Sequence, residues 1–180
     1  ISMKSRGLLS KDCVVGTVMS NLGFMRAMKA AGIEVITTPV GDRYVLEQLI
    51  ESSLSLGGEQ SGHVIFKQLA NTGDGVLTAL QLLQELKRSG KSAHELASVM
   101  TRFPQVLINV RNVSKENFSS SQAIWDAVHT AETQLGDTGR VLLRTSGTEP
   151  LVRVMVEASS DTVASAIASS LAEVVLQELG

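Results

Sequence analysis

Two short polar segments hold most of the side chains that could bind a ligand. The first joins two apolar runs and reads Arg144-Thr145-Ser146-Gly147-Thr148-Glu149-Pro150. The planar guanidinium group of Arg144 matches the geometry of a phosphate, and Arg153, in the following run, would add a second positive charge. Gly147 lets backbone amides approach an anion, and Ser146 and Thr148 contribute hydroxyls. These features indicate a phosphate-binding loop that needs no metal, although residue chemistry alone fits a solvated polar β-turn equally well.

The second segment reads Gly57-Gly58-Glu59-Gln60-Ser61-Gly62-His63. It combines a carboxylate, an amide, a hydroxyl and an imidazole, the mixture of donors and acceptors that sugar hydroxyls require. Glu59 could accept hydrogen bonds from two adjacent hydroxyls, and His63 could titrate near neutral pH and assist proton transfer. Taken alone, the segment is better interpreted as a flexible loop with a structural histidine.

The other polar residues favour structural roles over a metal site. Asp42 stands beside Arg43, a poor arrangement for a hard cation, and Asp42 and Asp74 are each adequately explained as helix caps. His94 and His129 lie on predicted helices without partners at metal-ligand spacing. We therefore expect no metal ligands in this chain.

Composition excludes several classes of function. The 180 residues include 16 basic and 18 acidic side chains, a formal charge of −2, and this near balance argues against nucleic-acid and membrane-surface partners. Only 3% of residues are aromatic, so a site built on stacked rings is not expected. Cys13 lies in an apolar run and is interpreted as a buried thiol. Neither a membrane-spanning stretch nor a signal peptide is evident, which predicts a cytoplasmic protein.

The first hundred residues alternate strand-like and helical patterns. Strands are predicted at 13–18 and 33–38, and a further apolar run at 64–66 follows the second polar segment. Helices in this region are predicted to begin at N-caps, and the first of them is predicted to end at Gly32, where a positive φ is favoured. The predicted N-caps are Ser20 or Asn21, Asp42 and Asp74.

Two helices complete this first region. The helix after Asp74 carries an apolar stripe that we expect to be buried, comprising Leu77, Leu80, Leu83 and Leu86. Ser92 and Glu95 form a capping-box pattern that opens another helix, predicted to run to about Arg102. The alternation predicts an α/β domain over residues 1–103, with a mostly parallel sheet flanked by helices.

Pro104 marks the predicted boundary of a second domain, residues 104–180. Strands are predicted at 106–113, 140–144 and 151–157, with a helix from Ser119 through Gln134. A final helix, capped by Asp161, places Val163, Ile167, Leu171 and Val175 on one face. Because strands follow each other across short loops, this domain should be an antiparallel sheet with helices on one side.

Together, the two polar segments resemble motifs of the α-D-phosphohexomutase superfamily. Residues 58–63 are similar to the sugar-binding loop of that superfamily's third domain, and residues 144–150 are similar to the phosphate-binding loop of its fourth. Gln60 in the first loop resembles the bacterial phosphoglucosamine mutase branch. So do the segments Thr17-Val18-Met19-Ser20-Asn21-Leu22-Gly23, Val40-Gly41-Asp42-Arg43-Tyr44-Val45 and Arg153-Val154-Met155-Val156-Glu157. The resemblance covers essentially the whole chain.

The resemblance implies an isomerase that interconverts glucosamine 6-phosphate and glucosamine 1-phosphate through a bisphosphorylated intermediate. The product leads to UDP-N-acetylglucosamine and peptidoglycan. The implied sugar-binding residues are Glu59, Gln60, Ser61 and His63, the last a candidate acid/base or orienting group. The implied phosphate-binding residues are Arg144, Thr145 through its backbone amide, Ser146, Gly147, Thr148 and Arg153.

Two motifs of such enzymes do not occur in this sequence. One is the catalytic phosphoserine of the first domain, and the other is the Asp-x-Asp-Gly-Asp-Arg loop of the second domain, which binds Mg²⁺. Phosphoryl transfer needs a nucleophile and charge neutralisation, so this chain alone is expected to be inactive and to bind no cofactor. The expected partners are a hexosamine phosphate and the missing N-terminal domains, and a homodimer is left open.

Two alternatives remain. A phosphomannomutase/phosphoglucomutase would have a broader choice of sugar and would differ mainly in the first loop, where Gln60 favours the amino sugar. A stand-alone phosphosugar-binding module would never have had catalytic domains. Because the sequence begins at Ile1, a fragment is favoured over such a module.

Overall fold

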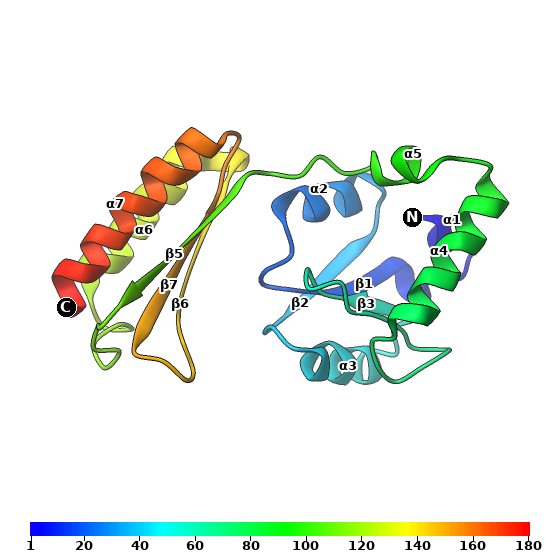
Figure 1. Cartoon of the computed structure of the whole chain (residues 1–180), viewed down its shortest axis with the longest axis horizontal. Helices are drawn as coiled ribbons and strands as arrows, with labels where there is room; N and C mark the ends of the chain where they lie inside the picture. Colours follow the sequence, from blue (N-terminus) through cyan, green and yellow to red (C-terminus); the bar gives the residue numbers. More distant parts are fainter. The chain divides into compact units, whose positions relative to one another are not determined.

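The computed structural model describes all of the residues from Ile1 to Gly180. The chain divides into two compact units, Ile1–Arg102 and Phe103–Gly180 (Figure 1). The helices and strands of the first unit are α1 (Ser2–Ser5), a 3-10 turn (Ser10–Asp12), β1 (Cys13–Thr17), α2 (Leu22–Ala30), β2 (Glu34–Thr38), α3 (Asp42–Glu51), β3 (Leu56–Gly58), β4 (Val64–Phe66), α4 (Gly75–Ser89) and α5 (Ala93–Ala97). Those of the second are β5 (Gln105–Arg111), α6 (Gln122–Leu135), a 3-10 turn (Gly136–Thr138), β6 (Arg140–Thr145), β7 (Leu151–Glu157) and α7 (Asp161–Leu179).

The first unit contains a four-stranded sheet in the order β2-β1-β3-β4. The central strand β1 is parallel to both β2 and β3, and β4 pairs antiparallel with β3 at the edge. The chain leaves β1 through α2 to reach β2 on one side, then crosses through α3 to β3 on the other. In open α/β sheets, ligands bind at the carboxyl ends of the strands where such a reversal occurs, which here are β1 and β3. The predicted mostly parallel sheet is confirmed.

Successive side chains of β1 point to opposite faces of this sheet. Cys13 and Val15 pack with Leu49 of α3, whereas Val14 packs with Met28 of α2, and all of them are nearly inaccessible to solvent. The two helices accordingly lie on opposite sides of the sheet (Figure 1). Because both faces are covered, β1 has the uninterrupted apolar character that parallel strands require.

The second unit is an antiparallel sheet in the order β5-β7-β6. Helices α6 and α7 lie side by side on one of its faces (Figure 1). Val152, Val154 and Val156 of the central strand point into the core with these helices and are fully buried. The predicted antiparallel sheet with helices on one side is confirmed.

Local capping signals placed several helix ends correctly. The Asn21 side chain accepts a hydrogen bond from the Gly23 amide, and Asp74 accepts one from the Leu77 amide. Ser92 and Glu95 form both bonds of a capping box. These caps act within three residues of their own position, so sequence alone specifies them.

Two predicted caps are wrong. The N-cap of α3 is Gly41, with φ +135°, and Asp42 is the first helical residue. The N-cap of α7 is Ser160, which accepts from the Val163 amide, while Asp161 begins the helix. Each carboxylate still lies in the first turn, where a negative charge interacts favourably with the helix dipole.

Several predicted boundaries also differ, among them the end of the strand predicted at 106–113, which is Arg111. Helix α5 ends at Ala97 instead of about Arg102, and α6 begins after its cap at Ser121 instead of at Ser119. The glycine pair 57–58 lies in strand β3 and not in a loop. A side chain at Gly57 would lie 2.8 Å from Val45 Cγ1 of α3, so glycine permits this strand to pack against the helix.

The predicted burial of the α4 leucines is wrong. Leu80 and Leu83 are 56% and 59% exposed, and no residue of this helix is fully buried. Polar contacts connect α4 to the N-terminal helix α1, because Ser2 donates to Glu85 at 2.6 Å and accepts from Arg88 at 2.8 Å. Helical periodicity identified an apolar stripe but could not specify what covers it.

Helix α7 is the one helix long and apolar enough to cross a membrane by length and composition, contrary to the expectation that no stretch approaches that length. Ile167, Leu171 and Val175 are buried in the core of the second unit, whereas Val163, predicted on the same face, is 37% exposed. The core position of α7 accounts for its apolar character.

Candidate functional site

The loop at 146–150 connects β6 to β7, and two arginines flank it on directly opposite positions. Arg144 and Arg153 are partners in the antiparallel register of these strands. Opposed like charges on adjacent strands destabilise a sheet unless an anion lies between or beside them. The pair therefore creates a positive site at the entrance to the loop.

The environment of the two guanidinium groups also favours the binding of an anion. Burial, and secondly the charge of Arg153, lower the pKa of Arg144 from its ordinary value. The Nε atom of Arg153 is buried and has no hydrogen-bond partner, and the nearest carboxylate oxygen, Oε2 of Glu149, is 4.0 Å from its Nη2. A buried donor without an acceptor is costly, so a ligand that accepts from it would be bound favourably.

Ser146 organises the turn itself. Its hydroxyl is buried and accepts from the Glu149 amide at 3.2 Å, while its own amide donates to the Leu151 carbonyl at 2.9 Å. Lys115 Nζ donates to the Ser146 carbonyl at 2.8 Å, which brings a third cation to the loop. No local sequence pattern indicates Lys115, because it lies 31 residues away from Ser146.

The remaining predicted phosphate-binding residues lie at the tip or in the strand. Gly147 and Thr148 are exposed, and a side chain at Gly147 would meet no atom within 4 Å. Thr145 is half-buried in β6, paired with Val152. The loop thus presents open backbone and a hydroxyl next to Arg144 and Arg153.

The second polar segment forms a tight hairpin between β3 and β4. The Glu59 amide donates to the His63 carbonyl at 3.0 Å, and the Gly62 amide donates to the Glu59 carbonyl at 3.1 Å. Gly62 adopts φ +95°, a conformation that other residues rarely take. The segment predicted as flexible when taken alone is therefore a hydrogen-bonded turn.

This hairpin lies at the carboxyl ends of β1 and β3. Thr17, the last residue of β1, donates to the Gln60 side chain at 3.2 Å. Glu59 accepts from the Gly41 amide at 3.2 Å through Oε2 and from the Ser61 hydroxyl at 2.9 Å through Oε1. The end of β1, the residue before α3 and the β3–β4 hairpin are thus joined where ligands bind in this architecture.

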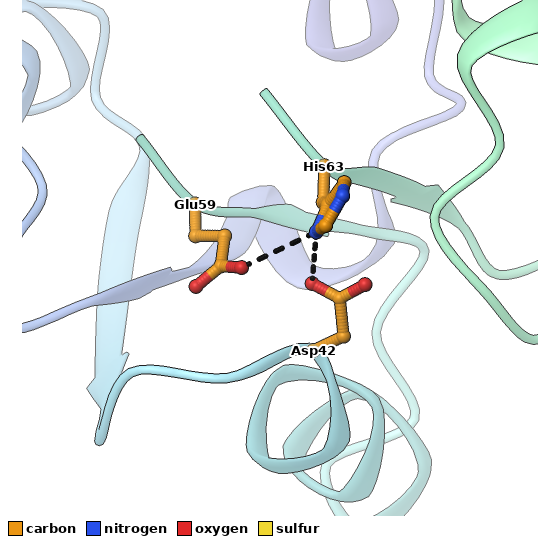
Figure 2. A group of neighbouring side chains, drawn as sticks. All are labelled: Asp42, Glu59 and His63. Carbon is orange, nitrogen blue, oxygen red and sulfur yellow. Dashed lines mark hydrogen bonds and ion pairs between the residues drawn. The ribbon is translucent and has the colours of Figure 1, made fainter. Parts of the chain in front are cut away.

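The imidazole of His63 lies between two carboxylates (Figure 2). Its Nδ1 is 3.0 Å from Asp42 Oδ1 and 3.4 Å from Glu59 Oε1. Asp42 was assigned only a capping role from the sequence, but its side chain interacts with His63, 21 residues away. A carboxylate bound to Nδ1 fixes the ring orientation and favours the tautomer protonated there.

Comparison with known proteins identifies the family. The model for phosphoglucomutase/phosphomannomutase α/β/α domain III matches residues 2–103, and that for the C-terminal domain of the same enzymes matches residues 107–174. This chain therefore belongs to the phosphoglucomutase/phosphomannomutase family and comprises its third and C-terminal domains.

The curated relatives most similar to this chain include several phosphoglucosamine mutases. The chain is 56% identical to the phosphoglucosamine mutase of Parafrankia sp. (strain EAN1pec) over 99% of its length and 58% identical to that of Frankia alni over 97%. It spans 38% of each of those proteins. Among solved structures, Aspergillus fumigatus N-acetylphosphoglucosamine mutase in complex with GlcNAc-6P and magnesium matches with a TM-score of 0.80. That match covers 97% of this chain and 41% of the other, at 20% identity, and supports the fold alone.

Proposed function

We propose that this chain is the substrate-holding part of a phosphoglucosamine mutase, which interconverts glucosamine 6-phosphate and glucosamine 1-phosphate. The observation that carries the proposal is the opposed pair Arg144 and Arg153, with a buried Arg153 Nε that lacks an acceptor. A dianionic phosphate would relieve the repulsion between these cations and would supply the missing acceptor.

In this proposal the loop at 144–150 binds the phosphate that does not react. Arg144 and Arg153 supply charge, and Gly147 and Thr148 supply an open backbone and a hydroxyl at the tip. Thr145 contributes its amide, while the buried Ser146 hydroxyl maintains the turn and remains a candidate donor. Lys115 adds positive charge from the base of the loop.

The hairpin at 58–63 binds the sugar. Glu59, Gln60 and Ser61 provide acceptors and donors for hydroxyl groups and for the amine of glucosamine. Hydrogen bonds to Gly41 and Thr17 hold Glu59 and Gln60 in place before a ligand arrives, which reduces the ordering cost of binding. Asp42 orients the His63 ring through Nδ1. The other ring nitrogen, Nε2, then serves either as an acceptor for a sugar hydroxyl or as an acid/base group.

The chemical step is assigned to polypeptide outside this sequence. The 180 residues contain no Asp-x-Asp-Gly-Asp-Arg loop, so they do not fit the magnesium site of the family. Residues 1–103 would serve as the sugar-binding domain and residues 104–180 as the phosphate-binding domain of a cytoplasmic enzyme. Its other domains are the proposed protein partners, and light scattering on the full-length enzyme decides whether it is a homodimer.

Amide chemical shifts provide the test of the two binding loops. Titration of the ¹⁵N-labelled chain with glucosamine 6-phosphate should shift Gly147 and Thr148 together with Ser61 and Gly62, whereas inorganic phosphate should shift only the first pair. Mannose 6-phosphate should bind more weakly if the amino sugar is selected. Absence of shifts at Gly147 and Thr148 would refute the phosphate site, and shifts there that persist in Arg144→Ala would do the same.

An activity assay tests the assignment of the chemistry. The purified chain should produce no glucosamine 1-phosphate from glucosamine 6-phosphate, with or without Mg²⁺ and a hexose bisphosphate. Measurable conversion would contradict the proposal, because the reaction would then need no phosphoserine or aspartate loop.

A further inference from the structure

Three potential metal ligands converge in the first unit, beside the carboxyl end of β3. Asp42 comes from the first turn of α3, Glu59 follows β3, and His63 precedes β4 (Figure 2). Their ligand atoms all lie within 4.8 Å of one another. Glu59 and His63 lie in one hairpin, whereas Asp42 comes from α3, so the convergence of all three does not follow from any short sequence motif.

The spacing of these atoms suits a small tetrahedral ion. The Nδ1 atom of His63 is 3.0 Å from Asp42 Oδ1 and 3.4 Å from Glu59 Oε1. Ligands bonded to zinc at about 2.0 Å in a tetrahedron lie about 3.3 Å apart. Small side-chain adjustments would therefore bring all three atoms to bonding distance of one ion.

The Glu59 carboxylate is already held in position. Its side chain is 7% exposed, Oε2 accepts from the Gly41 amide, and Oε1 accepts from the Ser61 hydroxyl. Hydrogen bonds of this kind orient the ligands of metal sites and reduce the ordering cost of binding. The loop around Gly73 is also close, because a side chain there would lie 3.1 Å from His63 Cβ and 3.3 Å from Asp42 Oδ2.

Charge at the cluster favours a cation. The His63 imidazole is the one basic group paired with Asp42 and Glu59, and Arg43, the residue next to Asp42, is instead paired with Glu47. With a neutral imidazole the cluster carries two negative charges and no fixed positive charge. A divalent ion would neutralise both carboxylates and relieve their repulsion.

We propose that Asp42, Glu59 and His63 form a binding site for Zn²⁺. An imidazole with two carboxylates suits zinc better than Mg²⁺, which prefers oxygen ligands in an octahedron. Because His63 and Asp42 are 58% and 36% exposed, water can occupy the fourth position. Three protein ligands with one open position are typical of zinc sites that exchange a ligand.

Zinc at this position would compete with the sugar. This consequence rests on the proposed function, because Glu59 and His63 are the groups assigned to the sugar. An ion bound to them removes the acceptor atoms that hydroxyl groups would use. Excess zinc should therefore weaken hexosamine phosphate binding at the hairpin while leaving the phosphate loop unaffected.

Calorimetric titration of the 180-residue chain with Zn²⁺ alone tests the site. One ion should bind per chain, and His63→Ala and Asp42→Asn should each weaken binding at least about tenfold. His129→Ala, which removes an exposed helical histidine, and Cys13→Ser should bind zinc as the unmodified chain does. Co²⁺ should give the visible absorption of a tetrahedral site. No saturable binding, equal binding by His63→Ala, or an octahedral Co²⁺ spectrum would overturn the proposal.

A second titration separates this proposal from the proposed function. Glucosamine 6-phosphate should lower the apparent zinc affinity of the chain, and zinc should suppress the amide shifts at Ser61 and Gly62 but not those at Gly147. Zinc binding with no shifts from the sugar phosphate would uphold the metal site and contradict the proposed function. Sugar-phosphate shifts without zinc binding would uphold the proposed function and contradict the metal site.

Discussion

Arg140 and Glu157 lie directly opposite each other in β6 and β7, and Arg140 Nε donates to Glu157 Oε2 at 2.7 Å. Four residues along β6, on the same face of the same strand pair, Arg144 lies opposite Arg153. One end of the ladder thus contains a compensated charge pair, and the other contains two like charges. This asymmetry identifies the loop end as the place where an external anion is needed.

Glu157→Gln should lower the free energy of unfolding of the second unit by about 2–3 kcal/mol. The Glu157 side chain is fully buried, and removal of its charge weakens its interaction with the half-buried Arg140. Urea denaturation monitored by circular dichroism measures the change. Glu47→Gln is the matched control, since its pair with Arg43 is exposed and should contribute less than about 0.5 kcal/mol. Equal effects of the two substitutions would contradict this account.

Arg144→Met should have opposite effects on stability and on binding. Without ligand, the variant should be at least as stable as the unmodified chain, because burial and the charge of Arg153 both oppose the charged form of Arg144, as its lowered pKa indicates. Thermal shift assays should show that glucosamine 6-phosphate stabilises the unmodified chain but not the variant. Arg88→Met, which removes a cation from the first unit, should retain the shift. A ligand-induced shift in Arg144→Met would be inconsistent with a phosphate site at this arginine.

Gly23→Ala should destabilise the first unit by about 1–3 kcal/mol. A side chain at this position would lie 1.9 Å from the carbonyl oxygen of Thr101, so the segment after α5 would have to move away from α2. Gly75→Ala is the control, because this first residue of α4 has open space around it and a negative φ. The control should be neutral or stabilising by up to about 1 kcal/mol. Chemical denaturation of both variants measures the difference.

Burial raises the pKa of the Cys13 thiol, and the nearby Glu34 carboxylate raises it further. Because the folded state holds this proton more tightly than the unfolded state, the resulting stability is complete below the ordinary thiol pKa and is lost as pH rises above it. The free energy of unfolding should therefore fall more steeply with alkaline pH in the unmodified chain than in Cys13→Ala. A thiol reagent should modify Cys13 only after unfolding, and rapid modification of the native chain would exclude this interpretation.

Sequence patterns succeeded where the interaction is local and failed where it spans the fold. Asn21, Asp74 and the pair Ser92–Glu95 cap helices through bonds to nearby amides, and all three were predictable. The contact between Asp42 and His63 depends on how α3 lies against the β3–β4 hairpin, so the sequence suggested only a cap for Asp42.

The same distinction holds for the phosphate loop. Arg144 and Arg153 were identified as candidates by residue type, but their direct opposition depends on the strand register. Lys115 reaches the loop from the segment after β5, and no pattern near residue 146 indicates it. Residue chemistry alone fitted a phosphate-binding loop and a solvated turn equally well. The proximity of Arg144, Arg153 and Lys115, which come from β6, β7 and the segment after β5, favours the phosphate-binding loop.

The exposed face of α4 leads to the last prediction. Leu80 and Leu83 expose more than half of their surface, so Leu80→Gln and Leu83→Gln should each change the free energy of unfolding by less than about 0.5 kcal/mol. Both should reduce concentration-dependent association of the chain, because exposed neighbouring leucines favour contact between molecules. Leu49→Ala is the contrast, since this fully buried side chain of α3 should cost about 2–5 kcal/mol when truncated. Denaturation and analytical ultracentrifugation measure the two properties. A loss of stability in Leu80→Gln comparable with that in Leu49→Ala would show that the Leu80 side chain is buried against another part of the chain.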